Sequence, residues 1–190
     1  MQQVEFAGER ATDVNSVEDL SGYPGTRVVA QVSVRPPVLA LSPLDPSVVR
    51  GLAAHFRAAL RRCVFVLDGA GALGLFAGRE SICRYISDAP VRAFATAGRF
   101  VICLVGGRRV ALFPLFSGSP VSREVASAGL EPGLDFETLE LVSADEARVV
   151  VFVRTARGDA VQLVALAVPG SLEAPEDVGR RLFWAVQGDE

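Results

Sequence analysis

The sequence of 190 residues contains no lysine, so all of its 19 basic side chains are arginines. Without lysine the chain cannot form a Schiff base or a phosphate-binding P-loop, because both need that side chain. A GC-rich genome explains the absence most simply, since lysine codons are rich in A and T. Selection against ubiquitin attachment in a eukaryotic host cell is the alternative explanation.

Cysteine and histidine are also scarce. The cysteines Cys63, Cys83 and Cys103 are odd in number and lack the C-x-x-C spacing of a metal site, and His55 is the only histidine. They predict buried, reduced thiols and a cytoplasmic location, or the host cytoplasm or nucleus for a viral protein. We expect no metal, no cofactor and no catalytic residue, with His55 at the edge of a helix face.

Long apolar runs and clustered positive charge are missing as well. The longest apolar runs, at 149–153 and 163–168, are far too short to span a bilayer, which predicts no membrane partner. No N-terminal segment has the basic and apolar pattern of a secretion signal. The net charge is −3 and the arginines are scattered, so nucleic-acid binding is not expected.

What is present is apolar sequence, which makes up 50% of the chain and predicts one folded domain over 25–190 after a polar, flexible arm at 1–24. The expected strands lie at 26–34, 64–78 (a pair), 100–105, 110–116, 137–142 and 149–168 (a pair). The expected helices lie at 46–60, at 82–97 and from Pro175 onward, and a loop at 117–135 contains one helical turn at 121–127. Pro90 is expected to break or kink the second of these helices, and Gly98 can cap its end. The fold class is therefore α+β, a mostly antiparallel sheet of hairpins with about three helices packed on it.

The segment VFVLDGAGALGLFAG at 64–78 allows two interpretations. Gly69, Gly71 and Gly74 match the G-x-G-x-x-G loop of dinucleotide-binding proteins, which would make the chain a small NAD(P)-binding oxidoreductase. That loop must open a helix, and glycine-rich GALGLFAG is a poor helix former. We favour a hairpin, with Leu73 and Leu75 in an extended strand, and keep the oxidoreductase as the alternative.

A longer pattern covers residues 63–107: an apolar strand, Asp-x-x-Gly, a short strand, a helical pattern ending at Ala-Gly, and another strand. The sequence of this stretch is CVFVLDGAGALGLFAGRESICRYISDAPVRAFATAGRFVICLVGG. It resembles the repeated motif of the SUKH superfamily, especially its cytomegalovirus-type tegument branch, and differs from it at Ala72-Leu73 and Pro90. The resemblance implies a non-catalytic binding module. Bacterial members act as toxin-neutralising immunity proteins, and viral members antagonise host defence.

The sequence thus predicts a protein–protein interaction module whose partner is another protein, with a homodimer as one form of this association. The final helix predicts a partner-binding surface of Trp184, Phe183, Arg180 and Arg181. On the helix at 46–60, Arg50, Arg57 and Arg61 are expected to face away from the core. The tripeptide Arg157-Gly158-Asp159 matches an integrin-binding motif, but it is expected to be an ordinary hairpin turn.

Overall fold

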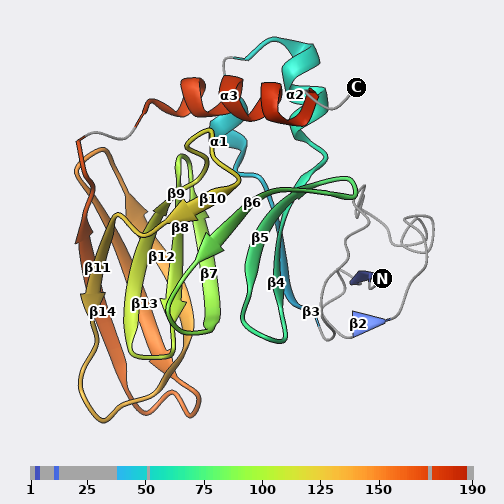
Figure 1. Cartoon of the computed structure of the whole chain (residues 1–190). Coiled ribbons are helices and arrows are strands. Elements are labelled where there is room, and N and C mark those ends of the chain that lie inside the picture. The colour runs from blue at the N-terminus through green and yellow to red at the C-terminus, as the bar shows by residue number, and fades with distance from the viewer. Residues whose placement is uncertain (1–2, 5–10, 13–37, 51, 171–172, 188–190) are drawn as a thin grey trace.

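The computed structural model describes residues 3–4, 11–12, 38–50, 52–170 and 173–187 of the chain. Strands dominate this part of the chain, and its three helices gather at one end of them (Figure 1). The helices are α1 (Pro46–Val49), α2 (Ala54–Leu60) and α3 (Pro175–Gln187). The strands are β1 (Gln3–Val4), β2 (Ala11–Thr12), β3 (Val38–Pro43), β4 (Cys63–Asp68), β5 (Leu73–Ala77), β6 (Glu80–Ile86), β7 (Val91–Ala97), β8 (Phe100–Val105), β9 (Arg109–Pro114), β10 (Val121–Arg123), β11 (Ala126–Gly129), β12 (Phe136–Ala144), β13 (Arg148–Thr155) and β14 (Val161–Ala167).

Apart from the short pair β1–β2, the described strands form three sheets. Their strand orders are β10-β6-β5-β4-β3 in a five-stranded sheet, β11-β9-β8-β7 in a four-stranded sheet and β12-β13-β14 in a three-stranded sheet. Neighbouring strands are antiparallel, except that β10 runs parallel to β6. The α+β class and the antiparallel hairpins are confirmed, with three sheets in place of the single sheet that was expected.

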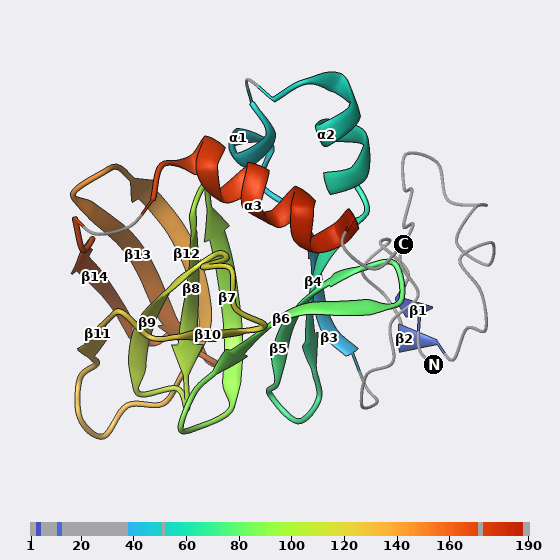
Figure 2. The same ribbon diagram turned by 45° about the horizontal axis from the view of Figure 1, so that its top comes forward.

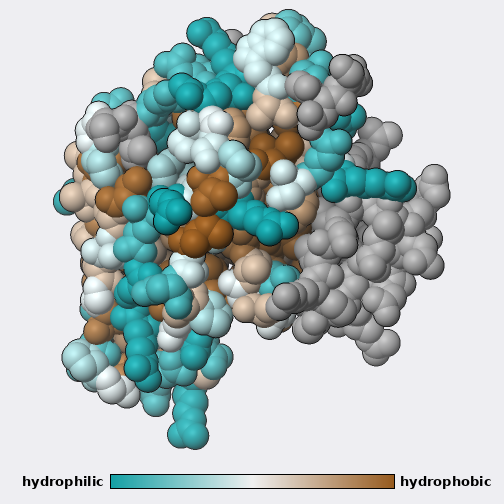
Figure 3. Space-filling model, in the orientation of Figure 1, coloured by the Kyte–Doolittle hydropathy of each residue, from teal (hydrophilic) through white to brown (hydrophobic). Residues whose placement is uncertain are grey.

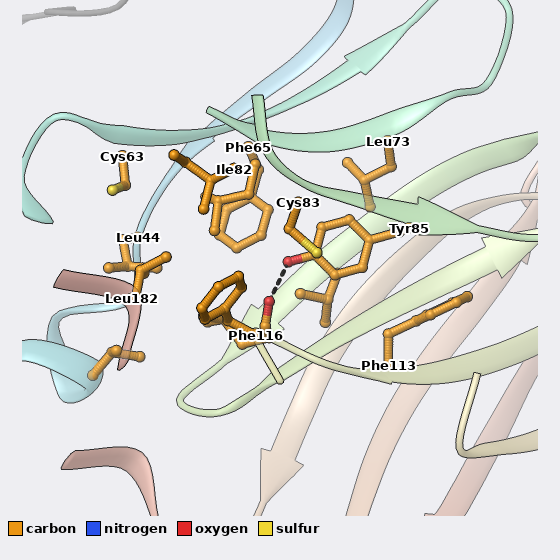
Figure 4. Packing of buried hydrophobic residues seen from close by; sticks show 14 of the residues in the cluster. Leu44, Cys63, Phe65, Leu73, Ile82, Cys83, Tyr85, Phe113, Phe116 and Leu182 are labelled. Atoms are coloured by element: carbon orange, nitrogen blue, oxygen red, sulfur yellow. Dashed lines mark hydrogen bonds between the residues drawn. The ribbon is translucent and has the colours of Figure 1, made fainter. Parts of the chain in front are cut away.

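The first hydrophobic core lies between the five-stranded sheet, the four-stranded sheet and the helices. Strands β4 and β8 are continuous apolar runs, and every residue of both is buried. The Tyr85 ring lies between those of Phe65 and Phe113, with centroid distances of 6.0 and 5.9 Å. The Tyr85 hydroxyl donates a 2.6 Å hydrogen bond to the backbone oxygen of Leu115, which satisfies the one polar atom of this ring (Figure 4).

The second core lies between the four-stranded and the three-stranded sheets. Strand β13 alternates along this interface, because Val149, Val151 and Val153 are fully buried while the residues between them are not. Two polar contacts also join the sheets: an ion pair of 2.8 Å from Arg92 to Asp135, and a hydrogen bond of 2.9 Å from the Phe136 amide to the Gly107 carbonyl. The two sheets are therefore layers of one sandwich.

The helical layer covers the ends of these sheets, and α3 runs across them with α1 and α2 beside it (Figure 2). Asp45 begins α1 as expected: one carboxylate oxygen accepts from the Ser47 amide at 2.8 Å. The other accepts from the Gly98 amide at 2.9 Å, which ties the helix to the β7–β8 turn. Gly179 lets α3 approach α1 closely, since a Cβ there would lie 2.6 Å from the Val48 oxygen.

The helix expected at 82–97 is wrong, because the segment forms strands β6 and β7. Pairing with β5 overrides the helical spacing: Cys83 and Tyr85 turn into the core, while Arg84 turns out. Ile82 and Ile86 do not share a face of β6, because Ile82 is 8% exposed at an irregularity of the β5–β6 register and Ile86 is 47% exposed. Gly98 lies in the β7–β8 turn with φ +53° instead of ending a helix. The SUKH-type pattern included this helix, so the structure departs from that pattern here.

Four further expectations change or fall outside the described residues. The helix at 46–60 is two helices, because the chain is extended at Arg50 (ψ 132°) and again at Ala53 (ψ 158°). The break lets α2 pack on α3 while α1 stays tied to the β7–β8 turn. The helical turn at 121–127 is wrong: β10 and β11 pair there with β6 and β9. The strand at 26–34 and most of the arm at 1–24 lie outside the described residues.

Candidate functional site

The glycine segment at 64–78 is a hairpin, as favoured from the sequence. Leu73 and Leu75 lie in the extended, buried strand β5, where a dinucleotide-binding loop requires a helix. One oxygen of Asp68, Oδ1, accepts hydrogen bonds of 2.9 Å from the amides of Ala70 and Ala72 and so shapes the turn. These amides are therefore engaged by the chain's own carboxylate.

The space beside the glycines is also filled. Gly71 has φ +77°, and a Cβ at this position would lie 2.4 Å from the Cβ of Pro90. Its carbonyl accepts a 2.9 Å hydrogen bond from the Val91 amide, which docks the turn on the start of β7. Gly71 thus serves the packing of the hairpin against the next sheet, while a Cβ at Gly74 would lie 2.8 Å from the Phe76 ring of the same strand.

The three cysteines are buried and free, as expected. Burial raises the pKa of the Cys63 thiol to about 12 and that of Cys83 to about 11, and it raises the pKa of Cys103 further still. All three are neutral thiols at pH 7, which makes them poor nucleophiles.

A groove of about 450 Å³ lies between the start of α1, the β7–β8 and β12–β13 turns and the start of α3. Two carboxylates that line this groove, those of Asp45 and Asp145, already accept hydrogen bonds from backbone amides. Burial disfavours the charge on Asp45, but the hydrogen bonds from Gly98 and Ser47 outweigh burial and lower its pKa. Hydrogen bonds from the Ala147 and Arg148 amides lower the pKa of Asp145. Both carboxyls are ionised at neutral pH, and neither is poised as a general acid.

Other sequence candidates keep structural roles. His55 is exposed on α2 and its ring lies 4.2 Å from that of Phe56. Gly158, with φ +69°, sits in the β13–β14 turn, where Thr155 bonds to Asp159, so Arg157-Gly158-Asp159 is a hairpin turn. Within the described part of the chain, no three His, Cys, Asp or Glu side chains group as metal ligands would.

The predicted partner surface on α3 is partly accessible. Trp184 is 67% exposed, the largest value among the exposed large hydrophobic residues, and its ring rests edge-on against Phe183 at 5.4 Å. Arg180, one turn earlier on the same helix face, is exposed and pairs with Asp177 at 3.7 Å. Phe183 is buried, so little of its side chain is accessible. Arg181 is engaged by Glu173 and lies 3.5 Å from the Ser117 oxygen.

Sequence reasoning did not assign a role to the arginines beside this surface. The segment 46–67 holds four arginines and no acidic residue. Arg57, Arg61 and Arg62 are exposed at the end of α2, and none forms an ion pair with another described residue. Helix α2 packs on α3 through Phe56 and Phe183, whose ring centroids lie 4.3 Å apart. The surface of this layer, at the top of Figure 3, mixes hydrophilic and intermediate residues.

Comparison with known proteins leaves the chain without an assigned family. No protein-family model matches it, and no curated protein sequence is significantly similar to it. None of the described helices is long and apolar enough to cross a membrane. The exposed residues Trp184 and Arg180 of α3 and Arg57, Arg61 and Arg62 at the end of α2, two helices joined by the contact of Phe56 with Phe183, are together called the helical surface.

Proposed function

We propose that the protein is a non-enzymatic protein-binding module and that the helical surface is where it binds its partner. The observation that carries the proposal is the 67% exposure of Trp184, the one tryptophan of the chain. Tryptophan and arginine are the residues most enriched among those that dominate binding energies. An aromatic side chain supported by a buried neighbour, Phe183, is rigid before binding, so little conformational entropy is lost on association.

The charge of the helical surface indicates the chemistry of the partner. Arg57, Arg61 and Arg62 lack ion pairs within the described residues, and no acidic residue lies near them in the sequence. Complementary charge steers association and selects the partner. We therefore propose an acidic protein segment with an apolar side chain that packs on Trp184.

The roles implied by the SUKH resemblance fit within this proposal. Host-defence antagonism and toxin neutralisation both consist of binding another protein, so either is a specific version of a binding module. The identity of an acidic partner distinguishes between them.

The test uses Trp184 as its own reporter. A peptide of alternating glutamate and leucine, titrated at low salt, is expected to shift the tryptophan emission to shorter wavelength, and added salt is expected to weaken the binding. The double variant Arg57→Glu/Arg61→Glu is expected to lose at least tenfold in affinity. Arg157→Glu reverses a single charge in the distant β13–β14 turn and serves as the control, which is expected to bind almost normally.

Two results contradict this proposal. One is no emission shift with the peptide at any salt concentration. The other is a single-stranded oligonucleotide of equal charge that binds the same surface more tightly, which would make the partner a nucleic acid.

The alternative, a small NAD(P)-binding oxidoreductase, is tested separately. Because β5 replaces the required helix and Pro90 fills the space at Gly71, millimolar NADH or NADPH is expected to leave the thermal unfolding midpoint unchanged. A ligand that binds only the folded state must raise that midpoint. A rise of several degrees would support the oxidoreductase in place of the binding module.

A further inference from the structure

Part of the outer face of the three-stranded sheet, along β14 and the middle of β13, is apolar where polar residues are the rule. An antiparallel sheet that packs on a core with one face usually presents polar side chains on the other. Here Val161 and Leu163, on the outer face of β14, are 53% and 57% exposed. The next two outward residues of that strand, Ala165 and Ala167, are exposed as well. The outward column of β14 thus contains no polar side chain.

The neighbouring strand extends this surface. Phe152 of β13 pairs with Leu163, and Val150 pairs with Ala165, so these outward residues stand side by side. Phe152 and Val150 are only half-buried, although their neighbours Val149, Val151 and Val153 are fully buried on the inner side. Together Val150, Phe152, Val161, Leu163, Ala165 and Ala167 form one continuous patch, called the outer-sheet patch.

We propose that the outer-sheet patch is where two copies of this chain associate. The charges beside the patch favour a second copy as the occupant. Arg154 and Glu140 flank it on β13 and β12, are 53% and 70% exposed, and lie 3.5 Å apart. In a twofold dimer each copy presents both signs, so Arg154 of one copy meets Glu140 of the other. A partner with charge of a single sign would be matched at only one of these residues.

The size of the patch sets the strength of the association. With strands about 4.8 Å apart and about 3.3 Å per residue, the two strands that carry the patch present roughly 200 Å². A stable interface buries about 800 Å² on each partner, so the dimer is weak and reversible. Its dissociation constant is expected in the micromolar range or above, where it responds to the local concentration of the protein.

Sedimentation equilibrium of the full chain, from low micromolar to near-millimolar concentration, tests the proposal. The wild type is expected to shift from monomer toward dimer across that range. Leu163→Glu, which places a charge at the centre of the patch, is expected to weaken dimerisation at least tenfold. Trp184→Ala removes a similarly exposed apolar side chain from the helical surface and is expected to dimerise like the wild type. Far-ultraviolet circular dichroism verifies that each variant is folded.

A charge reversal tests the twofold arrangement. Arg154→Glu and Glu140→Arg alone are each expected to weaken the dimer several-fold, and the double variant is expected to restore it. A wild type that stays monomeric throughout, or Leu163→Glu that dimerises normally, would overturn the proposal. Loss of the dimer in Trp184→Ala with Leu163→Glu unaffected would also overturn it, because the interface would then be the helical surface. Binding of the acidic peptide by Leu163→Glu is a separate readout that reports only on the proposed function.

Discussion

Two hairpins with similar apolar sequences end up in different surroundings. In strands β4 and β5, all residues except Phe76 are buried: one face packs on the four-stranded sheet and the helices, and Val64 and Val66 on the other face cluster with Val38 of the neighbouring strand β3. In the hairpin of β13 and β14, the buried residues alternate with outward ones, and Val161 and Leu163 stay in solvent. The first hairpin is part of the scaffold, and the second has an apolar face without a partner.

The difference shows that apolar content alone does not distinguish a scaffold strand from a binding strand. Both hairpins bury apolar surface on their inner faces, and only the next layer of structure decides what happens to the outer face. Apolar residues that a fold leaves exposed in a continuous patch are the informative ones, since scattered exposed residues are normal.

The largest effect expected from this comparison concerns large apolar side chains. Phe65→Ala in β4 removes a fully buried ring that lies 5.9 Å from Phe94, and is expected to lower the free energy of unfolding by about 4 kcal/mol. Leu163→Ala in β14 is expected to change it by less than about 0.5 kcal/mol, because the side chain is already exposed. Urea denaturation of dilute protein measures both, and equal losses would contradict the assignment of the two faces.

The turn glycines provide the next comparison. Gly71 and Gly158 both have positive φ, but only Gly71 has a neighbour, Pro90, in the place of a Cβ. Gly71→Ala is expected to cost about 3 kcal/mol, from the left-handed backbone and the collision together. Gly158→Ala meets no atom within 4 Å and is expected to cost about 1 kcal/mol, from the backbone alone. Thermal unfolding of the two variants measures the gap, and a smaller loss for Gly71→Ala would show that the β4–β5 turn is not docked on β7.

The turn carboxylates give a smaller contrast. Asp68 is 7% exposed and accepts from two backbone amides, so Asp68→Ala is expected to cost about 2 kcal/mol by leaving those amides unsatisfied. Asp159 bonds to Thr155 in an exposed turn, and Asp159→Ala is expected to cost less than about 0.5 kcal/mol. Chemical denaturation compares the two variants. A loss of stability in Asp68→Ala as small as that in Asp159→Ala would contradict the role of Asp68 in the turn.

The smallest effect concerns the thiols at neutral pH. Because burial raises the pKa of Cys63 to about 12, the folded protein is expected to leave a thiol reagent unreacted at pH 8 until it unfolds. In the unfolded chain the thiols ionise near their ordinary pKa of 9.0, while in the folded chain they stay protonated. Their contribution to stability is therefore complete below pH 9 and is lost as the pH rises toward 12. Rapid labelling of native protein at pH 8 would contradict this burial.

Where local chemistry is decisive, the sequence predicted the structure. Asp45 and Pro46 mark the start of α1, Pro175 that of α3, and Asp68 with the following glycines marks a hairpin turn. The hairpin of β13 and β14 was also predicted, because its alternation and turn residues act within about 20 neighbouring positions. Of the predicted partner residues, Trp184 and Arg180 are accessible.

Other features depended on partners distant in the sequence. The apolar residues of 82–97 follow a helical spacing, but pairing with β5 and β8 places them in strands β6 and β7. From the sequence, Phe183 and Trp184 were equally good candidates for partner contacts, but Phe56 of α2 packs against Phe183. The unpaired arginines of α2 had one signal in the sequence, the absence of acidic residues in 46–67, and only the structure shows that no acidic side chain comes from elsewhere in its described part.

By itself, then, the sequence determined the α+β class, the hairpins and the buried thiols, because apolar periodicity and turn chemistry are local properties. The tertiary structure decided which strands lie in which sheet, which hairpin is covered on both faces and which apolar side chains remain in solvent. These outcomes depend on contacts between residues far apart in the chain, whose free energy is gained only when the layers pack together.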